Sequence, residues 1–352
     1  MKVGLIGFEG SGKSTLYRAA AAGAVKGDVT AVPVPDARFD RIVAQVKPKK
    51  VTPATVVLQD DLEDAHGVGG RLFSQRFLDE ARKVDVVLLV VRAFESDLVP
   101  YYAAVDPVRD LRALEVEMVL TDLQIVENRL ERLAKSQGAK APGSPDYIDR
   151  IVFEKVVGPL SDGIPIRNIE LDEDGETVVR NYQFLSAKQA VVAFNVAEAE
   201  AAAPPPAVAE EIAKLDAAGT QAFAVCAELE EEIAQLDSAD QPEFLSSLGL
   251  KEPASAKVVR AIYDALGLIT FYTAGENETK AWPLRRGSNA LKAAGTIHTD
   301  IAKGFIRAEV VHYADYDAYG SLDAAYHAGK MVLEGKEHVI QDGDLLHIRN
   351  KS

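Results

Sequence analysis

The feature that most constrains this chain is a glycine-rich stretch at residues 7–14, which reads Gly-Phe-Glu-Gly-Ser-Gly-Lys-Ser. It satisfies the pattern G-x-x-x-x-G-K-[ST]. A short apolar run precedes it at residues 3–7, and good helix formers follow it at residues 15–22. A strand, a glycine loop and a helix in this order can point backbone N–H groups at an anion near the positive end of the helix. The stretch therefore predicts a phosphate-binding loop; a glycine-rich turn that matches by chance is the alternative.

The residues of this loop have separate expected roles. The backbone N–H groups surround the phosphates, and Lys13 reaches the β- and γ-phosphates, where it also acts as a catalytic contact. Ser14 offers a hydroxyl to Mg²⁺, and Thr15 donates to the α-phosphate. The residues expected to bind the phosphates are therefore Gly10, Ser11, Gly12, Lys13, Ser14 and Thr15.

Bulk composition narrows the class of protein. The chain has 352 residues, which is long for one ordinary core and predicts two or three domains. No apolar run approaches the roughly 18 residues that a membrane span needs. The formal charge of −15 disfavours free-standing binding to DNA, because phosphate neutralisation needs a basic surface. The single cysteine, Cys226, excludes an internal disulfide framework and fits a cytoplasmic location.

Short apolar runs that alternate with helical patterns predict an α/β fold with a mainly parallel sheet covered by helices. The runs lie at residues 3–7, 55–58, 84–91, 190–195 and 222–226. Between Asp106 and Lys135, apolar residues recur at three- and four-residue steps, which predicts one amphipathic helix. We expect it to be half of a helical hairpin, with an unpartnered surface helix as the alternative. From Gly267 onward the chain is strand-rich, as in a compact β-grasp-like module.

A second motif, Asn195-Val196-Ala197-Glu198, follows an apolar run at the carboxyl end of a predicted strand, where ligands of open α/β sheets bind. P-loop GTPases read guanine there with N-K-x-D, whose aspartate accepts from two donors that adenine lacks. Here the lysine is absent and Glu198 replaces the aspartate, so the sequence favours ATP over GTP. A helix-capping asparagine followed by a solvated glutamate would also explain the tetrapeptide.

Together these motifs resemble the YchF-type Obg-like ATPases, which are P-loop proteins of the GTPase class that prefer ATP and associate with ribosomes. Besides the glycine loop, the stretches that carry the resemblance are residues 32–38, 46–50, 105–110, 195–198, 266–276, 293–300, 303–309 and 339–344. The resemblance is weakest between Gly138 and Leu185. It implies three parts: a P-loop domain of residues 1–105 and 186–266, an inserted helical domain of residues 106–185, and a C-terminal TGS domain of residues 267–352.

The resemblance also implies ligands and site residues. Its members bind ATP with Mg²⁺, hydrolyse it slowly and bind the ribosome, and no membrane association is expected. By position in the motif, Asn195, Val196 and Glu198 contact the base. Cys226 and Ala227 belong to the last loop on the base side. For Cys226, a small buried residue at a strand end is the alternative to any contact with the base.

The chain departs from this family after the strand at residues 55–58. Family members have D-x-A-G there, whose aspartate holds Mg²⁺ through water and whose glycine senses the γ-phosphate. Residues 59–67 instead read Gln-Asp-Asp-Leu-Glu-Asp-Ala-His-Gly, and the preceding switch segment is shortened. We expect Asp60 to serve the metal with Ser14, because Asp60 lies nearest the strand end. Asp61 and Asp64 are the alternatives.

The loop at residues 95–104 contains no histidine, although family members often carry one there. His66 is a candidate to position the attacking water, since its pKa lies near neutrality; a solvated loop histidine is the alternative. Two functions therefore stay open. One is a slow ATP hydrolase that acts with the ribosome, and the other is a nucleotide-binding adaptor that has lost its switches and hydrolyses little or nothing. No arginine lid or acceptor pocket supports a phosphotransferase.

Overall fold

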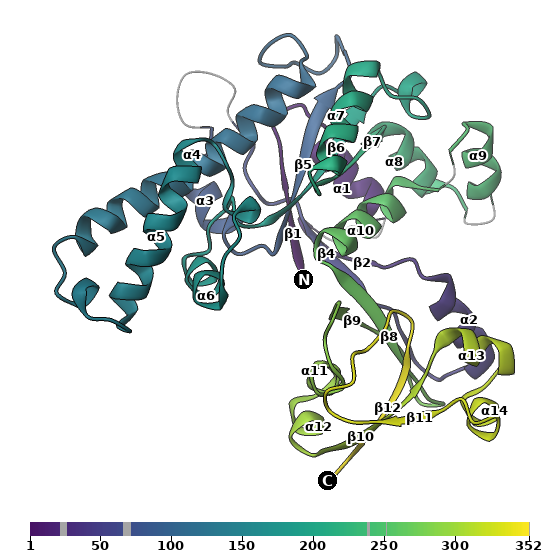
Figure 1. Ribbon diagram of the computed structural model, residues 1–352. Helices are drawn as coiled ribbons and strands as arrows, with labels where there is room; N and C mark the ends of the chain where they lie inside the picture. The colour runs from purple at the N-terminus through teal and green to yellow at the C-terminus, as the bar shows by residue number, and fades with distance from the viewer. Residues whose placement is uncertain (22–26, 66–71, 238–239, 251, 352) are drawn as a thin grey trace. The chain divides into compact units, whose positions relative to one another are not determined.

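The computed structural model describes residues 1–21, 27–65, 72–237, 240–250 and 252–351 (Figure 1). By its internal contacts the chain divides into two compact units. Unit 1 comprises Met1–Ala31 and Val57–Ile262, and unit 2 comprises Val32–Val56 and Tyr263–Ser352. Within the described residues, none of the helices is both long enough and apolar enough to cross a membrane.

The first sheet has six strands in the order β2-β4-β1-β5-β6-β7. Their bounds are β1 Lys2–Ile6, β2 Val29–Pro33, β4 Thr55–Gln59, β5 Val86–Ala93, β6 Gln189–Val196 and β7 Gln221–Val225. The pairs β4·β1, β1·β5, β5·β6 and β6·β7 are all parallel. All eight residues of β5 are buried, as expected for a central parallel strand. The predicted α/β fold with a mainly parallel sheet is confirmed.

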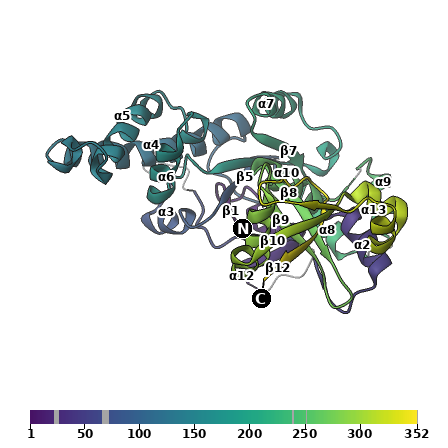
Figure 2. The same ribbon diagram turned by 60° about the horizontal axis from the view of Figure 1, so that its bottom comes forward.

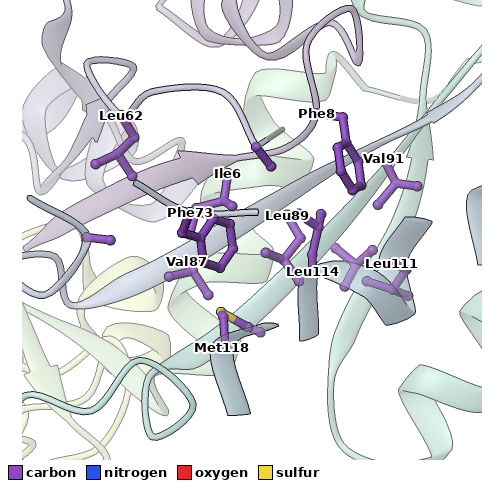
Figure 3. Close-up of a cluster of buried hydrophobic side chains, with 14 of the residues drawn as sticks. Ile6, Phe8, Leu62, Phe73, Val87, Leu89, Val91, Leu111, Leu114 and Met118 are labelled. Carbon is purple, nitrogen blue, oxygen red and sulfur yellow. The ribbon is translucent and has the colours of Figure 1, made fainter. Parts of the chain in front are cut away.

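Helices cover this sheet on both faces (Figures 1 and 2). Outside the segment between β5 and β6, unit 1 contains α1 Lys13–Ala20, α3 Gln75–Ala81, α7 Pro206–Ala217, α8 Ala227–Gln235 and α9 Gln241–Ser247, the short η3 Glu198–Glu200, and most of α10 Ala254–Ala265. Apolar side chains of β1 and β5 meet those of the neighbouring segments in one core, where Figure 3 shows Ile6, Leu89 and Met118. This core fixes the strand ends from which the candidate site is built.

The segment between β5 and β6 is helical. It contains α4 Pro107–Leu133, η1 Gly138–Lys140, α5 Pro145–Ser161, η2 Ile166–Asn168 and α6 Glu173–Tyr182. The predicted helix between Asp106 and Lys135 is present as α4, capped by the Asp106 carboxylate, which accepts from the N–H of Arg109 at 3.0 Å. Helices α4 and α5 lie side by side (Figures 1 and 2). The sequence predicts a hairpin partner for α4 within a helical insert but gives no bounds for α5 or α6, whose apolar spacing is irregular. These helices pack through a shared cluster around Phe153 and Phe184.

Asp122 of α4 is fully buried and ties this helical segment to the start of β6. Its carboxylate accepts from the backbone N–H groups of Leu185 at 3.1 Å and Ser186 at 2.6 Å. Burial raises the pKa of Asp122 to about 6, although the hydrogen bonds from Ser186 and Leu185 oppose this. The middle of α4 is therefore fixed to the residues that precede β6.

Unit 2 contains the second sheet, whose strands follow the order β11-β10-β12-β8-β9-β3. Their bounds are β3 Val51–Thr52, β8 Leu268–Ala274, β9 Thr279–Arg285, β10 Phe305–Val311, β11 Val332–Glu334 and β12 Leu345–Asn350. The accompanying helices are α2 Ala37–Val46, α11 Ala290–Ile297, α12 Thr299–Lys303, α13 Tyr313–Tyr319 and α14 Leu322–His327. Strands β8 and β9 pair antiparallel, while β3 pairs parallel to β9.

Residues 32–56 belong to unit 2 by their contacts, whereas the sequence-based division assigned them to the P-loop domain. Strand β3 adds to the edge of the second sheet beside β9. The Arg38 guanidinium donates to Asp342 at 2.8 Å and to Asp36 at 3.2 Å, which raises the pKa of Arg38 against the effect of its burial. The segment thus leaves the first sheet after β2 and returns to it at β4.

Candidate functional site

The glycine loop connects β1 directly to α1, as the sequence predicts. Gly10 and Gly12 adopt left-handed backbone conformations, with φ of 75° and 91°. A Cβ atom at Gly12 would also collide with the side-chain amide of Asn195. Gly12 is the N-cap of α1, so the loop turns its backbone toward the positive end of that helix. Both glycines are therefore required by geometry.

Lys13 begins α1 and is only 6% exposed. Its Nζ donates to the carbonyl oxygen of Gly7 at 3.2 Å and forms an ion pair with the carboxylate of Asp64. Burial lowers the pKa of Lys13 to about 8, while the carboxylates of Asp60 and Glu9 favour its charged form. The carboxylate oxygen of Asp64 supplies Nζ with the kind of anionic partner that a phosphate oxygen would supply.

Asn195 lies at the end of β6 and joins two other parts of the site. Its Nδ2 donates to the carbonyl oxygen of Ser11 at 3.0 Å, and its Oδ1 accepts from the N–H of Ala227 at 2.9 Å. The side chain is buried. Asn195 therefore connects the glycine loop to the start of α8, so its amide already has partners in the protein.

These segments enclose one cavity of about 560 Å³ in unit 1. Its walls come from the glycine loop, the ends of β5, β6 and β7, and the first turn of α8. All the residues predicted to bind the nucleotide line it: Gly10, Ser11, Gly12, Lys13, Ser14, Thr15, Asn195, Val196, Glu198, Cys226 and Ala227. The thiol of Cys226 is free, and burial raises its pKa, so it is a neutral wall group rather than a nucleophile.

Ser14 and Asp60, the predicted metal ligands, lie together. Burial raises the pKa of Asp60, and the nearby Ser14 hydroxyl and Lys13 ammonium oppose this rise. One oxygen of Asp60, Oδ1, is buried and has no hydrogen-bond partner within the described part of the chain. A hydroxyl and a carboxylate are hard oxygen donors of the kind that Mg²⁺ takes, so these residues fit the ion. No cluster of three or more acidic, histidine or cysteine side chains suited to a metal occurs among the described residues.

Two groups that the sequence reasoning did not single out also shape the cavity. The segment from Phe94 to Val99 forms a further wall, with Leu98 93% exposed at the rim. Arg92 lies behind it, 1% exposed, at the end of β5. An arginine that ends an otherwise apolar strand was an available signal, because a buried cation needs partners. His66, predicted to position water, lies outside the described residues.

The parallel sheet, and the glycine loop that leads from its first strand into a helix beginning with Lys13, define the class of P-loop nucleotide-binding proteins. The chain matches the solved structure of the Schizosaccharomyces pombe YchF GTPase with a TM-score of 0.87 and 30% identity, over 99% of this chain and 97% of that one. It is 36% identical over 365 residues to a Bacillus subtilis protein named ribosome-binding ATPase YchF, which covers 99% of both chains. It is also 36% identical to the protein of that name from Haemophilus influenzae, over 99% of this chain and 98% of the relative.

The family model YchF-GTPase_C, described as a protein of unknown function (DUF933), matches residues 268–351. This range falls within unit 2. The chain belongs to the YchF family.

Proposed function

We propose that this protein is an ATP-binding P-loop ATPase of the YchF type, which hydrolyses ATP slowly and associates with the ribosome. The proposal rests mainly on the cavity of unit 1, because every residue predicted to bind the nucleotide lines it. The names of the relatives support the remaining parts, since the Bacillus subtilis and Haemophilus influenzae proteins are called ribosome-binding ATPases.

In this proposal the glycine loop holds the phosphates. The N–H groups from Gly10 to Thr15 face the β-phosphate at the start of α1, where the helix dipole favours negative charge. Lys13 exchanges its ion pair with Asp64 for the β- and γ-phosphate oxygens. Ser14 contributes a hydroxyl to Mg²⁺, and Asp60 holds the ion directly or through water. When bound, Mg²⁺ neutralises phosphate charge and orients the phosphates.

The part of the cavity at the ends of β6 and β7 is assigned to the base. Val196 and Glu198 follow β6, and Cys226 with Ala227 follows β7, so these residues line one region of the wall. Asn195 supports this region by joining Ser11 to Ala227. Glu198 stands where a GTPase would place the aspartate that reads guanine, and no lysine accompanies it. We therefore assign adenine as the preferred base.

In this proposal the other parts of the chain bind the ribosome. Residues 106–185 form the inserted helical domain, and residues 267–352 form a TGS domain. Both would contact the ribosome, while the glycine loop and the strand ends of unit 1 hold the nucleotide. His66 is proposed to position the attacking water.

A single-turnover assay of ATP hydrolysis tests the proposal, using wild-type protein, Lys13→Ala and His66→Ala with and without ribosomes. We expect slow phosphate release by the wild type, none by Lys13→Ala, and reduced release by His66→Ala. Cosedimentation of the same samples with ribosomes reports association separately. If the protein binds ATP but shows no Lys13-dependent phosphate release with or without ribosomes, it is a nucleotide-binding adaptor and not an ATPase.

A further inference from the structure

Arg92 is a buried cation that lies behind the wall of the nucleotide cavity. Its guanidinium donates to three backbone carbonyl oxygens: from Nη1 to Gly10 at 3.2 Å and to Val99 at 3.1 Å, and from Nε to Phe94 at 3.0 Å. The guanidinium carbon lies 4.4 Å from the ring centroid of Phe94 and 4.8 Å from that of Tyr101. Every one of these partners belongs to the glycine loop or to the segment that follows β5.

Backbone dipoles and ring faces stabilise this guanidinium. Within the described part of the chain no ion pair joins the buried Arg92 to a carboxylate, although a buried charge is costly without compensation. The planar fork of arginine can reach several carbonyl groups at once, whereas a lysine ammonium at the end of a flexible stem cannot hold all three in a fixed geometry. The requirement is thus for arginine and not only for positive charge.

The three carbonyl groups come from two different walls of the cavity. Gly10 belongs to the phosphate wall, whereas Phe94 and Val99 belong to the wall at residues 94–99. The two walls approach closely, since a Cβ atom at Gly10 would lie 2.7 Å from the carbonyl oxygen of Pro100 and 3.3 Å from Nη1 of Arg92. Arg92 is therefore the side chain through which the two walls are joined.

We propose that Arg92 is a positioning residue for nucleotide binding, which fixes the phosphate loop and the segment at residues 94–99 as one preformed site. The inference rests on the proposed nucleotide binding of this cavity. Without the guanidinium, the Gly10 carbonyl loses its anchor and the facing wall loses two hydrogen bonds. The nucleotide must then order both walls as it binds, so the effect falls on affinity. A role confined to fold stability would leave the affinity of the folded protein unchanged.

Calorimetric titration with a non-hydrolysable ATP analogue and Mg²⁺ tests this inference on wild-type protein and Arg92→Lys, with thermal unfolding measured for each. The matched control is Phe153→Leu, which disturbs a buried core of the same unit away from the cavity. We expect Arg92→Lys to weaken binding about tenfold or more, as for buried carbonyls left without donors. The control should bind within roughly twofold of wild type even where its midpoint of unfolding falls equally.

Hydrogen exchange of the wild-type protein is a second, independent measurement. Wild-type hydrogen exchange should show the amides of residues 10–15 and 94–99 gaining protection together when the analogue binds, a result that needs no variant to fold. Unchanged affinity of Arg92→Lys, an equal loss in Phe153→Leu, or protection of residues 10–15 without residues 94–99 would each overturn the positioning role. No binding by the wild type would overturn the proposed function itself, whereas wild-type binding that Arg92→Lys matches overturns this inference alone.

Discussion

The phosphate loop at residues 7–14 and the segment at residues 59–65 both reach Lys13, but by different means. The loop does so with its backbone: the carbonyl oxygen of Gly7 accepts from Nζ, and Gly10 and Gly12 take the left-handed conformations that the turn requires. The later segment does so with carboxylates, since Asp64 forms an ion pair with Nζ and the charge of Asp60 favours the charged form of Lys13. Backbone geometry follows from a motif, whereas the placement of side chains depends on the whole fold.

The two regions are expected to serve different steps: the loop at residues 7–14 binds the nucleotide, and the segment at residues 59–65 acts on its metal ion or its affinity. The loop has the glycine conformations and the helix start of a phosphate cradle, and its residues line the cavity of unit 1. The acidic groups of the later segment act on Lys13, where Asp64 pairs with Nζ and Asp60 favours the charged form. Substitutions in the loop should therefore change binding strongly, and those in the later segment should change metal dependence or tune affinity.

The largest effect on nucleotide binding is expected for Lys13→Ala, because Lys13 contacts both Gly7 of the loop and Asp64 of the later segment. Loss of a buried charged donor to phosphate should weaken ATP binding by about 2–5 kcal/mol. The matched control is Lys188→Ala, since Lys188 is also partly buried and donates to the carbonyl oxygens of Arg82 at 2.8 Å and Val84 at 2.6 Å. Calorimetric titration of both variants measures the difference. Equal losses in the two would show that the affinity reports only general stability.

Asn195→Ala removes an uncharged side chain that holds the phosphate loop through Ser11. It leaves the buried carbonyl of Ser11 and the N–H of Ala227 without their partner, which should weaken ATP binding by about 1–3 kcal/mol. Ser144→Ala is the matched control, because it also leaves one carbonyl, of Gly138, and one N–H, of Tyr147, without a partner, at residues that do not line the cavity. Fluorescent-nucleotide displacement compares the two variants. A loss in Ser144→Ala as large as that in Asn195→Ala would contradict a specific role of Asn195 in joining the loop to α8.

Asp60→Asn should act on the metal and not on the nucleotide alone. The variant keeps a group of the same size beside Ser14 but removes the buried charge that fits Mg²⁺. We expect Mg²⁺ to be needed at about tenfold higher concentration, in the range found for outer ligands of metal sites. Titration of Mg²⁺ at fixed ATP analogue gives this value. ATP binding that is weakened equally with and without Mg²⁺ would contradict the assignment.

Asp64→Asn should have the smallest effect and the opposite sign. The Asp64 carboxylate competes with phosphate for Nζ of Lys13, so its removal should tighten ATP binding. The gain should be only a few-fold, roughly twofold to fivefold, because the Asp64 side chain is 44% exposed and solvent screens the pair. Titration at low and moderate salt measures it. Weaker binding in Asp64→Asn would place Asp64 among the groups that hold the ligand or its metal.

Several parts of the site could be predicted from the sequence because each depends on local geometry. The glycine loop, Lys13 and Ser14 follow from one motif, and the strand ends that carry Asn195 and Cys226 follow from apolar runs in a parallel sheet. These rules use periodicity and short-range backbone conformation. The glycine loop and the strand ends that line the cavity could therefore be predicted.

The remaining features depend on contacts between distant segments. An arginine at the end of an apolar strand signals a buried cation, but no local pattern identifies the partners of Arg92, the carbonyl groups of Gly10 and Val99. The two-residue strand β3 pairs with β9, which lies far along the chain. The sequence of residues 32–56 therefore did not indicate that this segment packs with the rest of unit 2. Helix α5 is likewise stabilised by packing around Phe153 and not by regular apolar spacing.

We propose that the cavity of unit 1 binds an adenine nucleotide through a preformed phosphate loop. The decisive experiment is calorimetric titration of the wild-type protein with non-hydrolysable ATP and GTP analogues, each with Mg²⁺. We expect saturable binding of one nucleotide per chain, with the ATP analogue bound more tightly. Failure of both analogues to bind folded protein would exclude this nucleotide site, and tighter binding of the GTP analogue would overturn the assignment of adenine.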